Sequence, residues 1–138
     1  MNAPTPRPHD AQRARPLSPH LTIYRWQPHM IVSVLHRITG GAITVAGLAL
    51  LTWWLVALAG DADGYATFQT HAGAWYGQLV LIGLTWAFFQ HTLSGLRHLV
   101  LDMGAGYELK VNRFWSIMTI AGSLFATALV WAIFKGVF

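Results

Sequence analysis

The chain has 138 residues, of which 54% are hydrophobic and only 10% are charged, and its mean hydropathy is +0.44. A soluble domain typically carries about 25% charged residues, so this composition predicts a small integral membrane protein. The absence of cysteine excludes disulfides, Cys-ligated metals and a thiolate nucleophile. The net charge of +4 comes mostly from basic residues before the first apolar stretch or around the second, which favours membrane topology over a nucleic-acid partner.

Residues 1–29 form a distinct N-terminal segment. It contains all six prolines and four of the arginines, and it lacks the apolar stretch of a signal peptide. We therefore expect a cytoplasmic segment with a disordered start.

Residues 30–138 are predicted to form an all-α membrane domain with three transmembrane helices. A span needs about 20 mainly apolar residues, and three stretches qualify, at 30–59, 75–101 and 114–137. We interpret residues 60–74 as the loop between the first two spans. Basic residues precede the first span and follow the second, whereas this loop carries two aspartates and no Lys or Arg. The N-terminus is therefore predicted to be cytoplasmic.

Two polar clusters lie inside apolar stretches, where ionisable groups are costly and so point to function. In the first, Ser33, His36 and Arg37 have i, i+3, i+4 spacing and share one helical face. Arg37 offers a planar fork of donors, suited to an anionic or carbonyl-bearing ligand. In the second, His91 and His98 lie seven residues apart, on nearly the same face of the second span.

Depth separates these histidines. His91 lies ten residues from the end of its span, roughly 15 Å inside, so it is the best candidate for an axial ligand of haem iron. His36 lies only six residues into the first span, and we expect it beside haem propionates or substrate. His98 is expected to be an interface residue. A self-contained b-type cytochrome using both His36 and His91 remains an alternative, which their difference in depth disfavours.

A transporter or proton channel is a further alternative. It would need polar groups on the third span, where Ser116, Thr119, Ser123 and Thr127 are the candidates. Because this stripe carries no charge, helix packing explains it well enough.

The same residues resemble a known family. Residues 15–24 (RPLSPHLTIY) and 33–40 (SVLHRITG), followed by 91–104 (HTLSGLRHLVLDMG), look like the signatures of the cytochrome b556 subunit of succinate dehydrogenase. The spacing agrees, and a third apolar stretch follows. Two departures stand out: Ser94 replaces a frequent Asn, and Leu101 a frequent Trp.

The resemblance implies a membrane anchor subunit of respiratory complex II. The N-terminal segment shows no evident presequence, which favours a bacterial inner membrane over a mitochondrial one. The resemblance also implies one b-type haem shared with a second small anchor subunit, with His91 as this chain's iron ligand. Ser33 and Arg37 match the family's ubiquinone-binding residues, and His36 and Arg37 those beside the haem propionates. The implied partners also include an iron–sulfur subunit and a flavoprotein subunit. A fumarate reductase anchor is a close variant.

Overall fold

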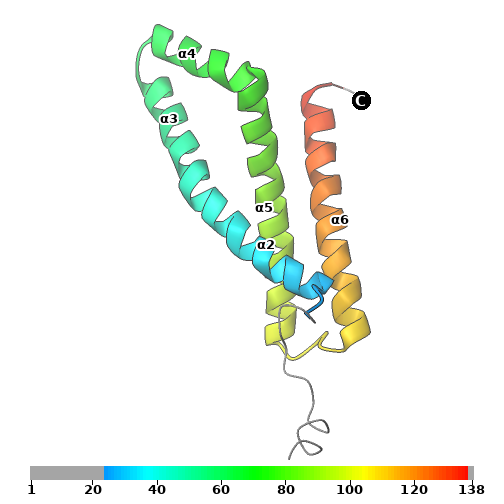
Figure 1. The fold of residues 1–138 in the computed structure, drawn as a ribbon. Coiled ribbons are helices and arrows are strands. Elements are labelled where there is room, and N and C mark those ends of the chain that lie inside the picture. The colour runs from blue at the N-terminus through cyan, green and yellow to red at the C-terminus, as the bar shows by residue number, and fades with distance from the viewer. Residues whose placement is uncertain (1–23, 137–138) are drawn as a thin grey trace, which may run out of the picture.

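A computed structural model describes residues 24–136, and this part of the chain is built from helices (Figure 1). Most of the predicted N-terminal segment and of the 15–24 motif lies outside the described residues, as does Val137, the predicted end of the third span. The elements in chain order are α2 (Pro28–Ala42), the π-helical turn η1 (Ile43–Gly47), α3 (Leu48–Ala59), α4 (Ala62–Gly73), α5 (Trp75–Asp102) and α6 (Leu109–Phe134).

Three of these helical segments are long and apolar enough to cross a membrane: Pro28–Ala59, Trp75–Asp102 and Leu109–Phe134. The first combines α2, η1 and α3. The third begins five residues before the predicted Phe114, because the polar first turn of α6 is helical too. The predicted all-α membrane fold with three transmembrane helices is confirmed.

The residues predicted to form a loop at 60–74 are mostly helical, which corrects that interpretation. Asp61 caps α4, its Oδ1 accepting a hydrogen bond of 2.7 Å from the backbone N–H of Gly64. Asp63 lies in the first turn and His71 in the last, a distribution that suits the helix dipole. Helix α4 therefore joins the outer ends of α3 and α5 as an ordered connector (Figure 1).

Helix α5 is the centre of the bundle, because it packs against α2 on one side and α6 on the other. Helix α2 also contacts α6, so three helices meet at the cytoplasmic end. Beyond η1 the first span diverges: α3 contacts η1 and α4 but does not pack on α5 (Figure 1). A π-turn adds one residue to a helical turn and is often found at functional sites.

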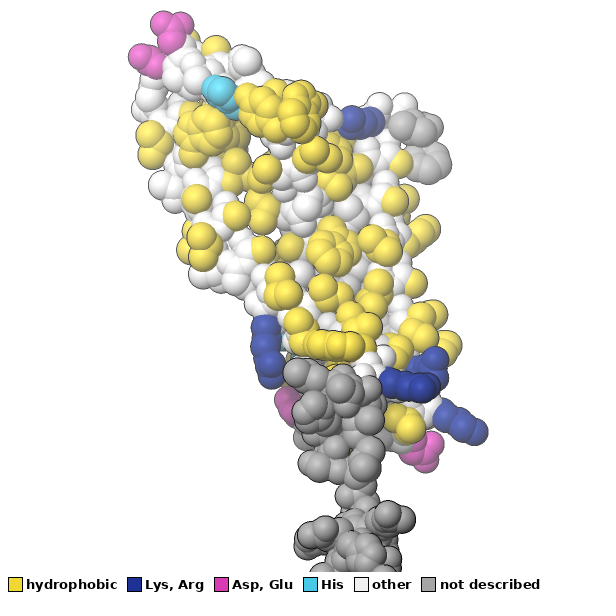
Figure 2. Space-filling model, in the orientation of Figure 1, with side chains coloured by type: hydrophobic (Ala, Val, Ile, Leu, Met, Phe, Trp, Pro, Cys, Tyr) yellow, Lys and Arg dark blue, Asp and Glu magenta, His cyan; other side chains and the backbone are white. Residues whose placement is uncertain are grey.

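The surface agrees with a membrane location. Large apolar side chains are exposed along all three spans. Figure 2 shows most of the Lys and Arg side chains at the end of the molecule where α2 begins and α5 ends. This is the end that the charge distribution assigns to the cytoplasm.

Candidate functional site

Three histidines from two helices meet where α2 crosses α5. The rings of His36 and His91 stack, with centroids 4.0 Å apart and planes 5° from parallel. The ring of His98 lies 5.1 Å from that of His36 at an angle of 60°. Sequence reasoning had assigned His98 to the interface and missed this contact, although its spacing of seven residues from His91 was visible.

His91 is held in one orientation and one tautomer by the backbone of α2. Its Nδ1 lies 3.0 Å from the carbonyl oxygen of His36. A carbonyl can only accept, so Nδ1 carries the hydrogen, and in the neutral ring this tautomer leaves the lone pair on Nε2. The Thr39 hydroxyl, which donates to the Leu35 carbonyl at 2.7 Å, lies 3.5 Å from the same nitrogen. Such a backbone bond is the usual support of a metal-ligating histidine.

Gly40 makes room for the His91 ring. A Cβ atom at this position would lie 2.9 Å from Cε1 and 3.3 Å from Nδ1 of His91, closer than carbon atoms normally approach. The next residue, Gly41, has open space around it. The glycine pair therefore has two different roles, and only Gly40 is tied to the histidine.

His36 is held by a residue that sequence reasoning did not place in the site. Its Nδ1 lies 2.8 Å from the Oγ of Ser94, which is fully buried. Ser94 lies one turn after His91 on α5, between the helix faces directed to α2 and α6. In the sequence, its position three residues after His91 was the signal that could have placed Ser94 near the histidines.

The depth argument separating His36 from His91 was wrong, because their rings are in direct contact. The stacking nevertheless argues against both rings binding one iron. Axial ligands point their nitrogens at the metal from opposite faces of the porphyrin, whereas these rings lie face to face at 4.0 Å with no space for a porphyrin plane between them. Each can still serve the same site in a different role.

Ser33 and Arg37 lie on the same helix as His36 but outside its packed contact with α5. Ser33 is half-buried and Arg37 is exposed. On a helical wheel Ser33 falls between His36 and Arg37, so the three form one continuous polar edge of α2. Within the described chain this edge is only partly covered, and at Arg37 it is exposed.

The polar stripe on α6 has the structural role expected of it. Ser116, Thr119, Ser123 and Thr127 are all buried. Their hydroxyls bond to carbonyls of their own helix, and Ser123 also bonds to Gln90 on α5 at 2.8 Å. Within residues 24–136 no group of three His, Asp or Glu side chains is arranged to hold a bare metal ion. The uncharged stripe gives no support to a transport pathway.

Comparison with known proteins gives a consistent result. Residues 11–130 match the family described as succinate dehydrogenase/fumarate reductase transmembrane subunit. The chain is 42% identical over 120 residues to the succinate dehydrogenase cytochrome b556 subunit of Paracoccus denitrificans, covering 87% of this chain and 92% of that one. The corresponding subunit of Rickettsia felis is 35% identical, with 85% and 90% covered. A mitochondrial cytochrome b560 subunit from Sus scrofa is 36% identical over 97 residues, with 69% and 57% covered.

Proposed function

Because the chain belongs to the succinate dehydrogenase/fumarate reductase transmembrane subunit family, we propose that its histidine cluster supports haem binding and quinone reduction. The chain is a membrane anchor subunit of succinate dehydrogenase and a multi-pass protein of a bacterial inner membrane. It is thus part of an oxidoreductase complex. The roles given below to individual residues are proposals, each supported by the geometry cited with it.

The observation that carries the proposal is the state of His91. Its Nδ1–H bonds to the His36 carbonyl, its Nε2 is left with a lone pair, and Gly40 clears the space beside the ring. This donor set fits a b-type haem, whose iron accepts a neutral imidazole nitrogen. A bound haem supplies a one-electron store within the membrane. His91 is proposed as this chain's single axial ligand.

His36 and Arg37 are proposed to face the haem propionates. His36 is oriented by Ser94, and the guanidinium of Arg37 provides a permanent positive charge near the cytoplasmic end. Ser33 and Arg37 are proposed to bind ubiquinone through hydrogen bonds to a carbonyl oxygen. In that role Arg37 holds positive charge where negative charge develops, and Ser33 can donate a hydrogen bond or move a proton.

The proposed site is incomplete within this chain, which supports the proposal that other subunits contribute to it. Arg37 is exposed, and the spans are mostly unburied in isolation. We propose that a second small anchor subunit supplies the other axial ligand. The iron–sulfur and flavoprotein subunits are proposed to oxidise succinate and pass electrons to the quinone.

The test uses the complex purified from cells that express all four subunits. His91→Ala removes the proposed ligand, so haem per complex measured by the pyridine haemochrome spectrum should fall to background. The matched control is His71→Ala, which removes an exposed histidine at the outer end of the molecule and should leave haem unchanged. Haem undiminished in His91→Ala, in an assembled complex, contradicts the ligand assignment.

The quinone role is tested in the same complex. Arg37→Ala should lower succinate:ubiquinone reductase activity by about tenfold or more, the effect of losing a charged hydrogen bond. Succinate oxidation by an artificial acceptor should persist. The control is Arg25→Ala, an exposed arginine preceding α2. Equal loss of both activities in Arg37→Ala would assign this residue a structural role instead.

A further inference from the structure

One buried hydroxyl lies against the support of His91. Thr39 is on α2, one turn after Leu35 and His36, and only 1% of its surface is exposed. Its Oγ1 lies 2.7 Å from the carbonyl oxygen of Leu35, 3.1 Å from that of His36 and 3.5 Å from Nδ1 of His91. Among residues 24–136 this is the side-chain hydroxyl that lies within hydrogen-bond distance of His91. Thr39 is therefore placed to influence the histidine directly.

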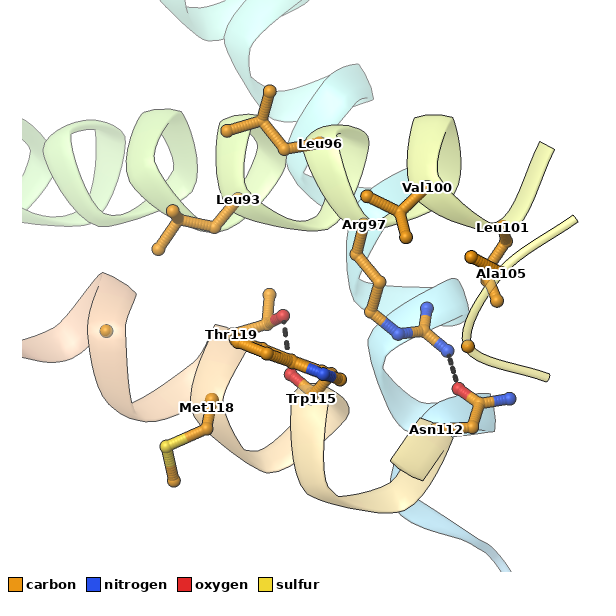
Figure 3. A pocket seen from close by; sticks show the side chains of 12 residues that line it. Leu93, Leu96, Arg97, Val100, Leu101, Ala105, Asn112, Trp115, Met118 and Thr119 are labelled. Carbon is orange, nitrogen blue, oxygen red and sulfur yellow. Dashed lines mark hydrogen bonds between the residues drawn. The ribbon is translucent and has the colours of Figure 1, made fainter. Parts of the chain in front are cut away.

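A second buried threonine shows which of these contacts is ordinary. Thr119 of α6 donates its hydroxyl to the carbonyl of Trp115, four residues earlier, at 2.9 Å (Figure 3). Thr39 makes the same bond to Leu35, and this is a common way for a threonine to satisfy its hydroxyl inside a helix. Within the described residues Thr119 has no counterpart of the contact with His91. That contact is thus not a consequence of the local helix geometry.

The capacities of the groups decide how this contact is polarised. A hydroxyl has one hydrogen and two lone pairs, whereas a carbonyl oxygen only accepts. The hydrogen of Thr39 is directed to a carbonyl, and Leu35 offers the shorter distance. Nδ1 of His91 carries a hydrogen, because it bonds to the carbonyl of His36 at 3.0 Å. The oxygen of Thr39 therefore faces this N–H as a second, weaker acceptor.

An acceptor beside Nδ1–H acts on the opposite side of the imidazole ring. It attracts the hydrogen and so increases the electron density on Nε2, the nitrogen proposed to bind the haem iron. A more electron-rich ligand favours ferric over ferrous iron. Hydrogen bonding around the axial ligands is one of the means by which a protein sets a haem potential.

We propose that Thr39 is a positioning residue whose hydroxyl oxygen sets the electron-donating strength of His91. The inference rests on the proposed role of His91 as a haem ligand and adds a second acceptor to its support. Its effect differs from that of Gly40, which leaves room for the ring. The hydroxyl can be removed with little change in side-chain volume, so the two effects can be separated by experiment.

The experiment uses the purified four-subunit complex and a redox titration of the reduced haem band. Thr39→Val removes the hydroxyl at nearly constant size, and Thr39→Ser keeps the hydroxyl but loses the methyl group. Should the valine variant fail to assemble, Thr39→Ala compared with Thr39→Ser isolates the hydroxyl at the smaller size. Thr119→Val is the matched control, because it removes a buried hydroxyl with the same bond to its own helix and no contact with His91 among the described residues.

We expect the Thr39→Val complex to retain its haem with a raised midpoint potential. Loss of one weak hydrogen bond corresponds to about threefold more ferrous haem at a given potential. At 59 mV per tenfold change for one electron, this is a rise of roughly 30 mV. The electron paramagnetic resonance g-values of the ferric haem should shift too, since they report the ligand field. Thr39→Ser and Thr119→Val should match the parent.

Parent-like values in an assembled Thr39→Val complex, or equal values in Thr39→Ala and Thr39→Ser, overturn the inference. An equal shift in Thr119→Val also overturns it, because any buried hydroxyl would then have the same effect. His91→Ala separates this inference from the proposed function. Haem undiminished in that variant contradicts the ligand assignment itself, whereas loss of haem there with an unchanged potential in Thr39→Val rejects the role of Thr39 alone.

Discussion

Helix α5 has two neighbouring polar faces that differ in what covers them. Gln90 faces α6 and His91 faces α2, because consecutive residues lie 100° apart on a helix. On the α6 face, Gln90 and Ser123 are fully buried by this chain alone. On the α2 face, His91 and His98 are only half-buried, although their rings are held in place.

This difference separates a structural polar contact from an unfinished site. Gln90 joins two helices of the same chain, because its Oε1 accepts a hydrogen bond from Ser123. Its Nε2 is buried and has no hydrogen-bond partner among residues 24–136. His91 is oriented by one nitrogen and keeps the other available, which supports the proposal that a group outside the chain completes its surroundings. Orientation combined with incomplete burial therefore indicates function better than polarity alone.

The largest expected effect comes from filling the space that Gly40 of α2 leaves for the His91 ring of α5. Gly40→Ala places a methyl group 2.9 Å from the His91 ring, so the ring must tilt or the helices must separate. Disturbing the support of a metal ligand typically weakens binding by about 10- to 100-fold. We expect a comparable loss of haem retention, measured as haem remaining per complex after dilution and gel filtration.

Gly41→Ala is the control for this prediction. No atom lies within 4 Å of the added methyl group, and the helix propensity change is the same. Its haem content should equal that of the parent. If the two alanine variants retain haem equally, the close approach of Gly40 to His91 does not matter for haem binding. The side of α5 that faces α2 would then not differ in function from the side that faces α6.

Sequence reasoning predicted the three spans and named the residues of the α2 face, because apolar length and buried ionisable groups are local signals. It failed on relations between helices. The crossing angle of α2 and α5 brings His36 onto His91 despite their different distances from the span ends, and linear depth cannot show this. From the sequence, Ser94 stands out only as a departure from the family pattern. Its hydrogen bond to His36 could not be predicted, because it depends on how α2 crosses α5. Asp61 did carry a visible capping signal for α4, which the interpretation of 60–74 as a loop overlooked.

A smaller effect is expected on the α6 face. Ser123→Ala removes the hydroxyl that donates to Oε1 of Gln90, the one hydroxyl among residues 24–136 that bonds to this amide. Hydrogen bonds between membrane helices contribute about 0.6 kcal/mol on average and up to about 1.7 kcal/mol. The thermal midpoint of the purified complex should therefore fall by a few degrees, roughly, while haem content and quinone reductase activity stay unchanged.

Thr92→Val is the matched control here, since Thr92 is exposed and its hydroxyl donates to the Phe88 carbonyl of its own helix. The thermal midpoint of the Thr92→Val complex should equal that of the parent within the error of the measurement. Loss of haem from Ser123→Ala at unchanged stability would show that the α6 face also serves the haem site, and the two faces would no longer be distinct.

The smallest effect is expected at Ser94, which lies where the two faces meet. Ser94→Ala frees the His36 ring from its 2.8 Å bond but leaves the His91 support intact, so haem should be retained. One hydrogen bond contributes about 1 kcal/mol, which corresponds to a shift of roughly 40 mV or less in a one-electron potential. Redox titration of the reduced haem band measures it. Ser94→Asn, the residue frequent in the family, supplies an amide and should restore the parent potential. If Ser94→Ala leaves the potential unchanged, the orientation of the His36 ring has no influence on the haem. The backbone bond from α2 to His91 would then be the contact that matters for the site.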